Sequence, residues 1–175
     1  YWSWINKGVG LVELERYEEA ITCYDKAIKL DPVGLDAWNN KGAVLNSLGR
    51  YEESIVCYDR ALEIDEEYAQ AWRGKGVTFD NLNKYEKAIE CYDRALEIDE
   101  KNVNAWNNKG NSLVHLEQYE KAIECFDRAL EIDEKFIFAL HKKGQAFEGM
   151  KKYQKAIKCY DRALEIDENN WNVLC

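Results

Sequence analysis

The chain has 175 residues, of which 46% are hydrophobic and 33% charged, and its formal net charge at pH 7 is −9. This acidic excess disfavours nonspecific binding to nucleic acid, which depends on the neutralisation of phosphates by Lys and Arg. No apolar run approaches the roughly 18 residues of a membrane span, and the chain opens on Tyr1 without a signal-peptide pattern, so we expect no membrane segment.

A fixed interval of 34 residues (57 − 23 = 34) organises the whole sequence. Five cysteines keep it: Cys23, Cys57, Cys91, Cys125 and Cys159. Columns of Gly, Tyr, Ile and Ala keep the same interval, beginning at Gly8, Tyr17, Ile21 and Ala27. A period of 34 residues is typical of stacked helix–turn–helix repeats. With one proline and no Gly/Ser-rich linker, we expect a single array over residues 1–175. Its repeats are 1–34, 35–68, 69–102, 103–136 and 137–170, and 171–175 begin a truncated sixth unit.

The third repeat shows why each unit is expected to hold two helices. Trp72, Gly76 and Phe79 stand at i, i+4 and i+7, which places them on one face of a first helix. A polar break follows at residues 81–84. The second half of the repeat again has helical spacing, with Tyr85, Ile89, Tyr92 and Leu96. A connection this short predicts an antiparallel helix pair.

Small residues face one another in this pair. Gly76 has no side chain, and Ala88 and Ala95 on the second helix have only a methyl group. We expect the two backbones to approach closely there, while Trp72 and Tyr92 fill the flanks. A glycine inside a helix costs roughly 1 kcal/mol relative to alanine, and five repetitions of that cost indicate a steric need.

The ends of the repeats carry turn and capping residues. Asn102 and Asn170 precede predicted first helices and are candidate N-caps. Asp99 and its column-mates are expected in the turns between repeats, bonded to nearby backbone amides. Those column-mates are Asp31, Asp65, Asp133 and Asp167.

These columns resemble the tetratricopeptide repeat (TPR) family over the whole chain. The first repeat matches its pattern with Trp4, Gly8, Leu11, Ala20, Tyr24, Ala27 and Pro32. The residue before the glycine departs from the pattern, since it is lysine in all five repeats and can lay its stem on the core. The resemblance implies an all-α fold, an α-α superhelix (solenoid) of five tandem repeats. It also implies a concave groove lined by first helices and a protein- or peptide-binding scaffold without catalysis.

The first-helix positions not needed for packing are the candidate binding residues. An asparagine inside a helix is unfavourable unless its amide is used, and that amide can pair with the backbone of an extended peptide. A ladder of this kind resembles the one in TPR arrays that bind extended peptides, although Gly74 and Lys142 interrupt it. The alternative is that these asparagines are only polar and solvated. The candidates for a peptide-binding groove are Asn6, Asn39, Asn40, Arg73, Asn107, Asn108, Asn111, His141 and Lys142.

A carboxylate clamp, as in TPR proteins that bind chaperone C-termini, is a second hypothesis for the groove. Arg73, Asn108 and Lys142 stand at three of the five positions of that family pattern. Val77 and Phe138 occupy the other two, where an Asn and a Lys are required.

The column cysteines are expected to be structural. Zinc ligands come at close spacing, and stacked helices about 8–10 Å apart are too distant for disulfides, whose Cα atoms lie about 4.4–6.8 Å apart. Free buried thiols fit a reducing, cytoplasmic compartment, whereas Cys175 at the terminus could oxidise between chains. No phosphate loop, calcium loop or Cys–His pair is present, so we expect no cofactor, no metal and no enzyme.

The leading hypothesis is a protein-interaction scaffold or adaptor that binds an extended peptide segment of a partner protein in its groove. A rival hypothesis is a self-assembling structural scaffold, because Trp171, Val173 and Leu174 start a unit that cannot finish and leave the C-terminal repeat uncapped. Alternatively, the chain is cut from a longer protein, for example as the targeting module of a larger enzyme missing from this chain.

Overall fold

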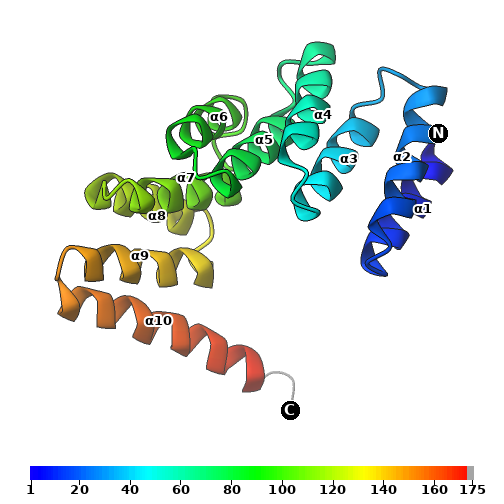
Figure 1. Cartoon of the computed structure of the whole chain (residues 1–175). Helices are drawn as coiled ribbons and strands as arrows, with labels where there is room; N and C mark the ends of the chain where they lie inside the picture. The colour runs from blue at the N-terminus through cyan, green and yellow to red at the C-terminus, as the bar shows by residue number, and fades with distance from the viewer. Residues whose placement is uncertain (173–175) are drawn as a thin grey trace. The chain divides into compact units, whose positions relative to one another are not determined.

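The computed structural model describes residues 1–172, with side chains described through Asp167, and groups them into two compact units. Unit 1 (Tyr1–Ile98) contains α1 (Trp2–Glu13), α2 (Tyr17–Leu30), α3 (Leu35–Ser47), α4 (Tyr51–Ile64), α5 (Ala69–Asn81) and α6 (Tyr85–Ile98) (Figure 1). Unit 2 (Asp99–Cys175) contains α7 (Val103–His115), α8 (Tyr119–Ile132), α9 (Ile137–Gly149) and α10 (Tyr153–Asn172). All ten elements in the described residues are helices, so the predicted all-α solenoid of helix–turn–helix repeats is confirmed.

Each repeat is an antiparallel helix pair joined by a turn of three residues. In the first turn Glu15 adopts a left-handed φ of 56°, and the Arg16 N–H donates to the Leu11 carbonyl at 2.8 Å. This bond closes a helix end of the Schellman type. The same turn recurs after α3, α5, α7 and α9, with Gly49, Asn83, Glu117 and Lys151 at the left-handed position. Second helices then pack on the next first helix, as α2 does on α3, α4 on α5 and α8 on α9.

Each glycine of the column makes room for an aromatic ring. The prediction was different: it placed the glycine backbone against the alanines of the second helix. A Cβ added at Gly76 would lie 2.6 Å from Cε1 of Tyr92, and the three nearest atoms all belong to that ring. Tyr92 is fully buried, and its hydroxyl donates to Oδ2 of Asp80 at 2.6 Å. The relation repeats at Gly110 with Phe126. The steric need inferred from the column is therefore real, but the ring of the same repeat creates it.

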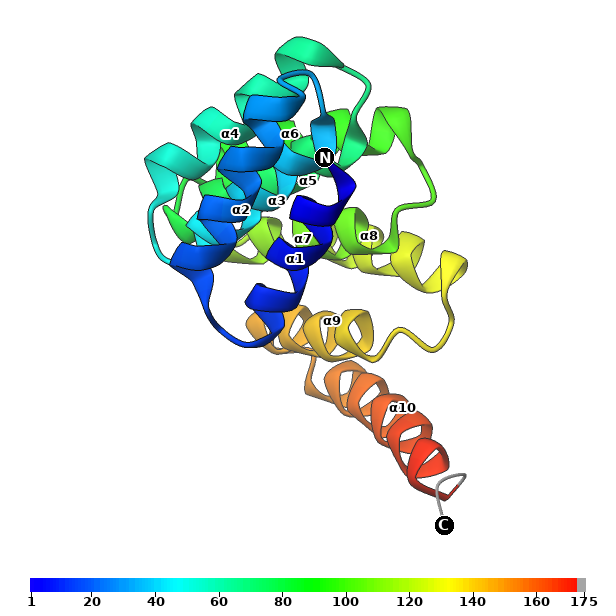
Figure 2. The same cartoon turned by 90° about the vertical axis from the view of Figure 1, so that its right-hand side faces the viewer.

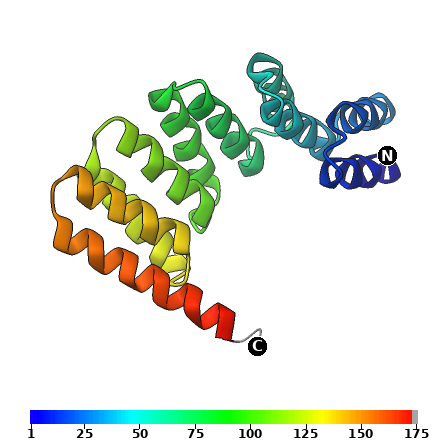
Figure 3. The same cartoon turned by 60° about the horizontal axis from the view of Figure 1, so that its bottom comes forward.

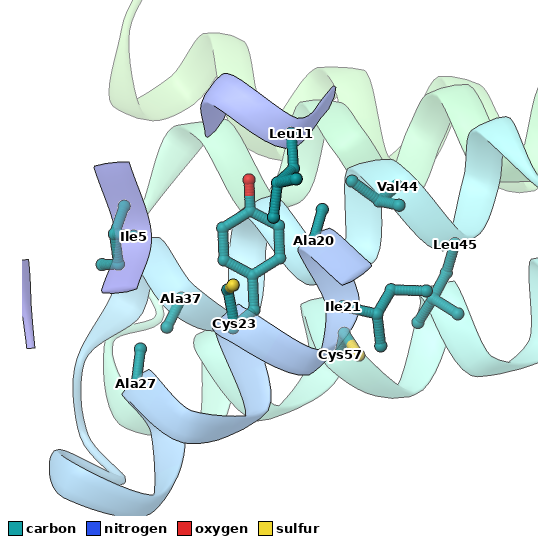
Figure 4. Close-up of a cluster of buried hydrophobic side chains, with 11 residues drawn as sticks. Ile5, Leu11, Ala20, Ile21, Cys23, Ala27, Ala37, Val44, Leu45 and Cys57 are labelled. Carbon is teal, nitrogen blue, oxygen red and sulfur yellow. The ribbon is translucent and has the colours of Figure 1, made fainter. Parts of the chain in front are cut away.

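The core of the first repeats shows where the cysteines lie (Figure 4). Cys23 and Cys57 belong to a cluster of buried side chains that includes Ile5, Leu11 and Leu45. All five column cysteines are buried and none forms a disulfide with a described residue, as expected for small apolar core residues. Cys175 lies outside the described residues.

The capping predictions are confirmed in the interior and wrong at the C-terminal end. Oδ1 of Asn102 accepts a hydrogen bond from the Ala105 N–H at 3.0 Å, as an N-cap does. Asn170 instead lies inside α10, which has 20 residues where α8 has 14. Asp167 is also inside this helix, although three of its column-mates accept backbone amides in turns: Asp65, Asp99 and Asp133. The first two residues of the predicted sixth unit, 171 and 172, thus continue α10, and 173–175 lie outside the described residues.

Candidate functional site

First helices of neighbouring repeats contact one another within each unit. In unit 1, α3 packs against both α1 and α5, and in unit 2, α7 packs against α9. We call the exposed sides of these helices the first-helix surface of unit 1 and the first-helix surface of unit 2. The predicted binding residues lie on these two surfaces.

The first-helix surface of unit 1 carries four of the candidates. Asn6 on α1 is exposed, while Asn39 and Asn40 on α3 and Arg73 on α5 are half-buried. Ile5, which shares the column of Asn39 and Arg73, is only 4% exposed and belongs to the core. The fifth position is therefore a packing position in the first repeat.

The interruption of the asparagine ladder at Gly74 has a packing cause. A Cβ at Gly74 would lie 2.5 Å from Cζ of Tyr58, a residue of the preceding repeat. The same ring stands 3.0 Å from the Cβ position at Gly42, although the other four column glycines have their own ring at 2.4–2.6 Å. Tyr58 is therefore set farther from its own glycine, and it closely approaches Gly74 of the next repeat.

Arg73 is a cation without a partner carboxylate. Among the described residues it makes no ion pair and no hydrogen bond. Burial raises the pKa of Tyr58 to about 12, and the nearby charge of Arg73 opposes that rise. Burial also raises the pKa of Tyr92, again against the charge of Arg73. The guanidinium thus lies close to two buried phenols and remains available to an anionic group.

Polar contacts that the sequence analysis missed tie the repeats of unit 1 together. Nδ2 of Asn81 donates to Oδ1 of Asn46 at 2.9 Å, and the Tyr68 hydroxyl donates to Oδ1 of Asp36 at 3.1 Å. Asn46 and Asn81 stand 35 residues apart, one more than the repeat length of 34. They therefore occupy different positions of their repeats, and comparing equivalent positions does not pair them.

Unit 2 brings three candidate amides together on α7. Asn107, Asn108 and Asn111 are all half-buried, and Nδ2 of Asn107 lies 3.5 Å from Oδ1 of Asn108. Oδ1 of Asn107 is buried and accepts no hydrogen bond from any described residue. A buried acceptor without a donor is uncommon, because it gives up its hydrogen bond to water without replacement. Oδ1 of Asn107 is therefore enclosed by the protein, although the three residues as a whole keep part of their surface exposed.

The two candidates on α9 have different surroundings. Lys142 is half-buried, whereas His141 is exposed, with its ring 5.5 Å from that of Tyr160. His141 lines an apolar cavity of about 390 Å³ between α9 and α10 together with Phe138 and Leu164. The structure therefore assigns His141 to this cavity and not to the amides of α7.

The carboxylate clamp stays a prediction. Arg73 lies in unit 1, while Asn108 and Lys142 lie in unit 2.

The lysine column has a function at the junctions between repeats that the sequence analysis did not identify. Nζ of Lys41 lies 2.6 Å from Oδ1 of Asp25, and Lys75 makes the same contact with Asp59 at 2.6 Å. Lys143 pairs with Asp127 in the same way. Each aspartate belongs to the preceding repeat and stands 16 residues before its lysine. This constant spacing is the signal in the sequence that could have revealed the pairs. We call this ion pair the junction bridge.

The described residues were also compared with the requirements of a metal site and of a membrane-spanning helix. Among residues 1–172 there is no cluster of three or more His, Cys, Asp or Glu side chains arranged to hold a metal ion. In the same part of the chain, no helix combines the length and the apolar character needed to cross a membrane.

Comparison with known families matches these repeats directly. Tetratricopeptide repeat models match residues 35–101, 103–136 and 137–170, and a further TPR repeat model matches 10–46. The chain belongs to the tetratricopeptide repeat family. No curated protein sequence matches it.

Solved structures share the TPR fold. A crystal structure of MamA is 24% identical with a TM-score of 0.82, covering 94% of this chain and 96% of that one. MamA 41-end from Desulfovibrio magneticus RS-1 is 18% identical with a TM-score of 0.83, covering 95% and 94%. YrrB, described as a TPR protein with an unusual peptide-binding site, is 24% identical with a TM-score of 0.73, covering 98% and 88%. At these identities the likeness concerns the fold.

Proposed function

We propose that this TPR chain is a protein-interaction scaffold whose first helices bind an extended segment of a partner protein. The observation that carries the proposal is the group of three half-buried amides on α7, which are Asn107, Asn108 and Asn111. Membership of the TPR family supports it, and YrrB shows the same fold in a protein with a peptide-binding site.

The amides suit a peptide backbone better than a particular side chain. Every peptide unit offers an N–H donor and a C=O acceptor, and an asparagine amide offers the complementary pair. In this proposal the amide groups of Asn108 and Asn111 donate to and accept from adjacent peptide units. Because backbone groups are common to all sequences, selectivity has to come from neighbouring positions such as Lys142.

Arg73 supplies charge selectivity on the first-helix surface of unit 1. A half-buried guanidinium with no carboxylate partner favours an acidic side chain or a free C-terminus, since charge-assisted hydrogen bonds are about twice as strong as neutral ones. We therefore expect ligands that bind the first-helix surface of unit 1 to carry an acidic group there.

The test begins with a peptide array, followed by affinity measurements on the tightest peptide with wild type, Asn40→Ala and Asn108→Ala. Each lost amide bond should weaken binding roughly five- to tenfold, corresponding to about 1 kcal/mol. Gln154→Ala removes an exposed amide from a second helix and is the matched control, which should bind like wild type. Equal affinity for all four proteins would reject the amide ladder. Amidation of the peptide C-terminus separately tests the carboxylate clamp, which requires a large loss of binding.

Self-association through the C-terminal repeat is the second candidate function. The specific observation in its favour is the exposed apolar face of α10, where Tyr153, Ile157 and Leu164 are 55%, 56% and 58% exposed.

A further inference from the structure

The fifth repeat has a group of four lysines that no other repeat shares. Two of them lie in the turn before α10 and two in the first two turns of that helix: Lys151, Lys152, Lys155 and Lys158. The equivalent residues of the preceding repeat are Glu117, Gln118, Lys121 and Glu124. Residues 142–162 include seven Lys and Arg but only two Asp and Glu, although the whole chain has 24 against 33. We call the four lysines the basic edge of unit 2.

The exposure of this edge comes from its position within the repeat. The counterparts of Lys155 and Lys158 are exposed in each of the four preceding repeats, all of which have a repeat after them: Glu19, Thr22, Glu53, Val56, Lys87, Glu90, Lys121 and Glu124. A following first helix packs instead on side chains such as Tyr119 and Ile123 of α8, which are half-buried. The two lysines of α10 therefore stand at positions that remain exposed inside the array.

Within the described part of the chain, no carboxylate neutralises the basic edge. None of its four lysines makes an ion pair there, whereas Arg16, the counterpart of Lys152 in the first repeat, pairs with Glu19 at 2.7 Å. The fifth repeat has Lys155 in place of that glutamate. Like charges three or four residues apart destabilise a helix. An anionic ligand bound at this edge would relieve the repulsion.

The basic edge leads into a groove between two second helices. In Figures 1 and 2, α9 lies between α8 and α10, and a cavity of about 540 Å³ is lined by residues of all three helices. Figure 3 shows the turn between α9 and α10 in orange at the left of the view. Leu130 of α8 and the buried Leu140 of α9 give the cavity an apolar part. Lys158 of the basic edge lines it together with Lys143 and Arg162.

An aromatic ring holds a second lysine of the edge close to this groove. Nζ of Lys155 lies 5.5 Å from the centre of the Phe147 ring, and Nζ of Lys143 lies 5.9 Å from it. The face of an aromatic ring attracts cations. This contact positions the ammonium group of Lys155 but leaves its charge in place, so the group remains available to an anion.

We propose that the basic edge and this groove bind an acidic segment of a partner protein that has apolar side chains between its carboxylates. The carboxylates pair with Lys155 and Lys158, and an apolar side chain enters the groove beside Leu130 and Leu140. The site uses none of the residues assigned to the first-helix surface of unit 2, so it is additional to the proposed function.

The groove favours a peptide over other polyanions. Asp127 and Glu131 also line it. They repel a nucleic acid, which has a charge on every nucleotide, whereas a peptide can place an apolar residue beside them. A membrane surface fits no better, because a plane does not enter a groove between two helices.

An array of peptides that differ in acidic and apolar content, followed by fluorescence anisotropy, tests this site. Wild type should bind acidic peptides that also contain leucine or phenylalanine. The double variant Lys155→Glu/Lys158→Glu should bind the tightest of them roughly tenfold more weakly or worse, because its charges repel the ligand. Analogues of that peptide with glutamine for glutamate, or serine for leucine, should also bind wild type more weakly. Added salt should weaken binding, since exposed charges are screened.

Matched variants separate this site from the other surfaces. Lys121→Glu reverses an exposed charge at the position of Lys155 in the preceding repeat, and Asn108→Ala alters the first-helix surface. Both should bind the peptide like wild type, and circular dichroism should show that the double variant keeps its helices.

Three results would overturn the proposal. One is that no acidic peptide binds wild type, and another is that the double variant binds as tightly as wild type does. The third is that the basic edge serves a different ligand: a single-stranded oligonucleotide, phosphatidylserine vesicles or a second copy of the chain binds more tightly than any peptide and loses that binding in the double variant.

Discussion

The same substitution at two helical glycines of unit 1 should change stability in opposite directions. Gly10 lies within α1, and a Cβ added there meets no atom within 4 Å. Gly76 lies within α5, and its Cβ would stand 2.6 Å from Cε1 and 2.9 Å from Cδ1 and Cζ of Tyr92. Both Gly10→Ala and Gly76→Ala gain helix propensity, so the contact with the ring accounts for the difference.

The magnitudes follow from these distances. Alanine in an exposed helix interior is favoured over glycine by roughly 0.5–1 kcal/mol, so Gly10→Ala should raise the free energy of unfolding by about that amount. Overpacking a filled core costs typically 1–3 kcal/mol. Tyr92 cannot easily move aside, because it is fully buried and its hydroxyl is bonded to Asp80 at 2.6 Å. After the propensity gain is subtracted, Gly76→Ala should lower the free energy of unfolding by about 1–2 kcal/mol.

Urea unfolding followed by circular dichroism measures both changes against wild type. A third protein isolates the cause: in a Tyr92→Phe background the ring loses its hydrogen bond to Asp80 and can shift, so the cost of Gly76→Ala should fall. Equal effects of Gly10→Ala and Gly76→Ala, or a cost at Gly76 that the Tyr92→Phe background leaves unchanged, would refute the steric account of this column.

Two further predictions concern the junctions and the thiols. Lys75→Met should lower the free energy of unfolding by about 1 kcal/mol or less, because the bridge to Asp59 is partly exposed; a double-mutant cycle with Asp59→Asn should show a coupling that shrinks in high salt. Burial raises the pKa of Cys57 from 9.0 to about 11, so its contribution to stability is fully present below pH 9 and is lost as pH rises through about 11. A smaller alkaline loss of stability in Cys57→Ala than in wild type would confirm this, and native Cys57 should react with iodoacetamide far more slowly at pH 8 than the urea-unfolded thiol.

The repeat and its helices could be predicted because the helix pairs pack in the same way in all five repeats. The same type of residue therefore recurs at the same position of each repeat. A column of glycine or alanine reports a constraint on volume, and the sequence alone located that constraint. It did not identify the partner in contact, so Ala88 and Ala95 were assigned to a space that the ring of Tyr92 fills. Contacts between repeats were harder to predict. Each junction bridge joins a residue of the lysine column to a residue of the aspartate column, and neither column shows the pairing by itself.

The continuation of α10 was beyond the sequence for a different reason. Asn170 resembles the N-cap Asn102 in its repeat position, but a cap requires a helix that begins there, and Asn170 lies inside α10. This helix continues past that position.

Variation within a column is informative about ligands only after packing has been accounted for. In the sixth position of the repeats, Gly74 differs from Asn40 because the ring of Tyr58 occupies its side-chain space, so this difference need not reflect ligand choice. Lys142 has no such explanation: it is half-buried, it makes no ion pair among the described residues, and Gly144 on the same helix already accommodates Tyr160. If the proposed function holds, we therefore expect the change from Asn108 to Lys142 within unit 2 to affect selection by charge, and ligand preference should respond when these two residues are exchanged.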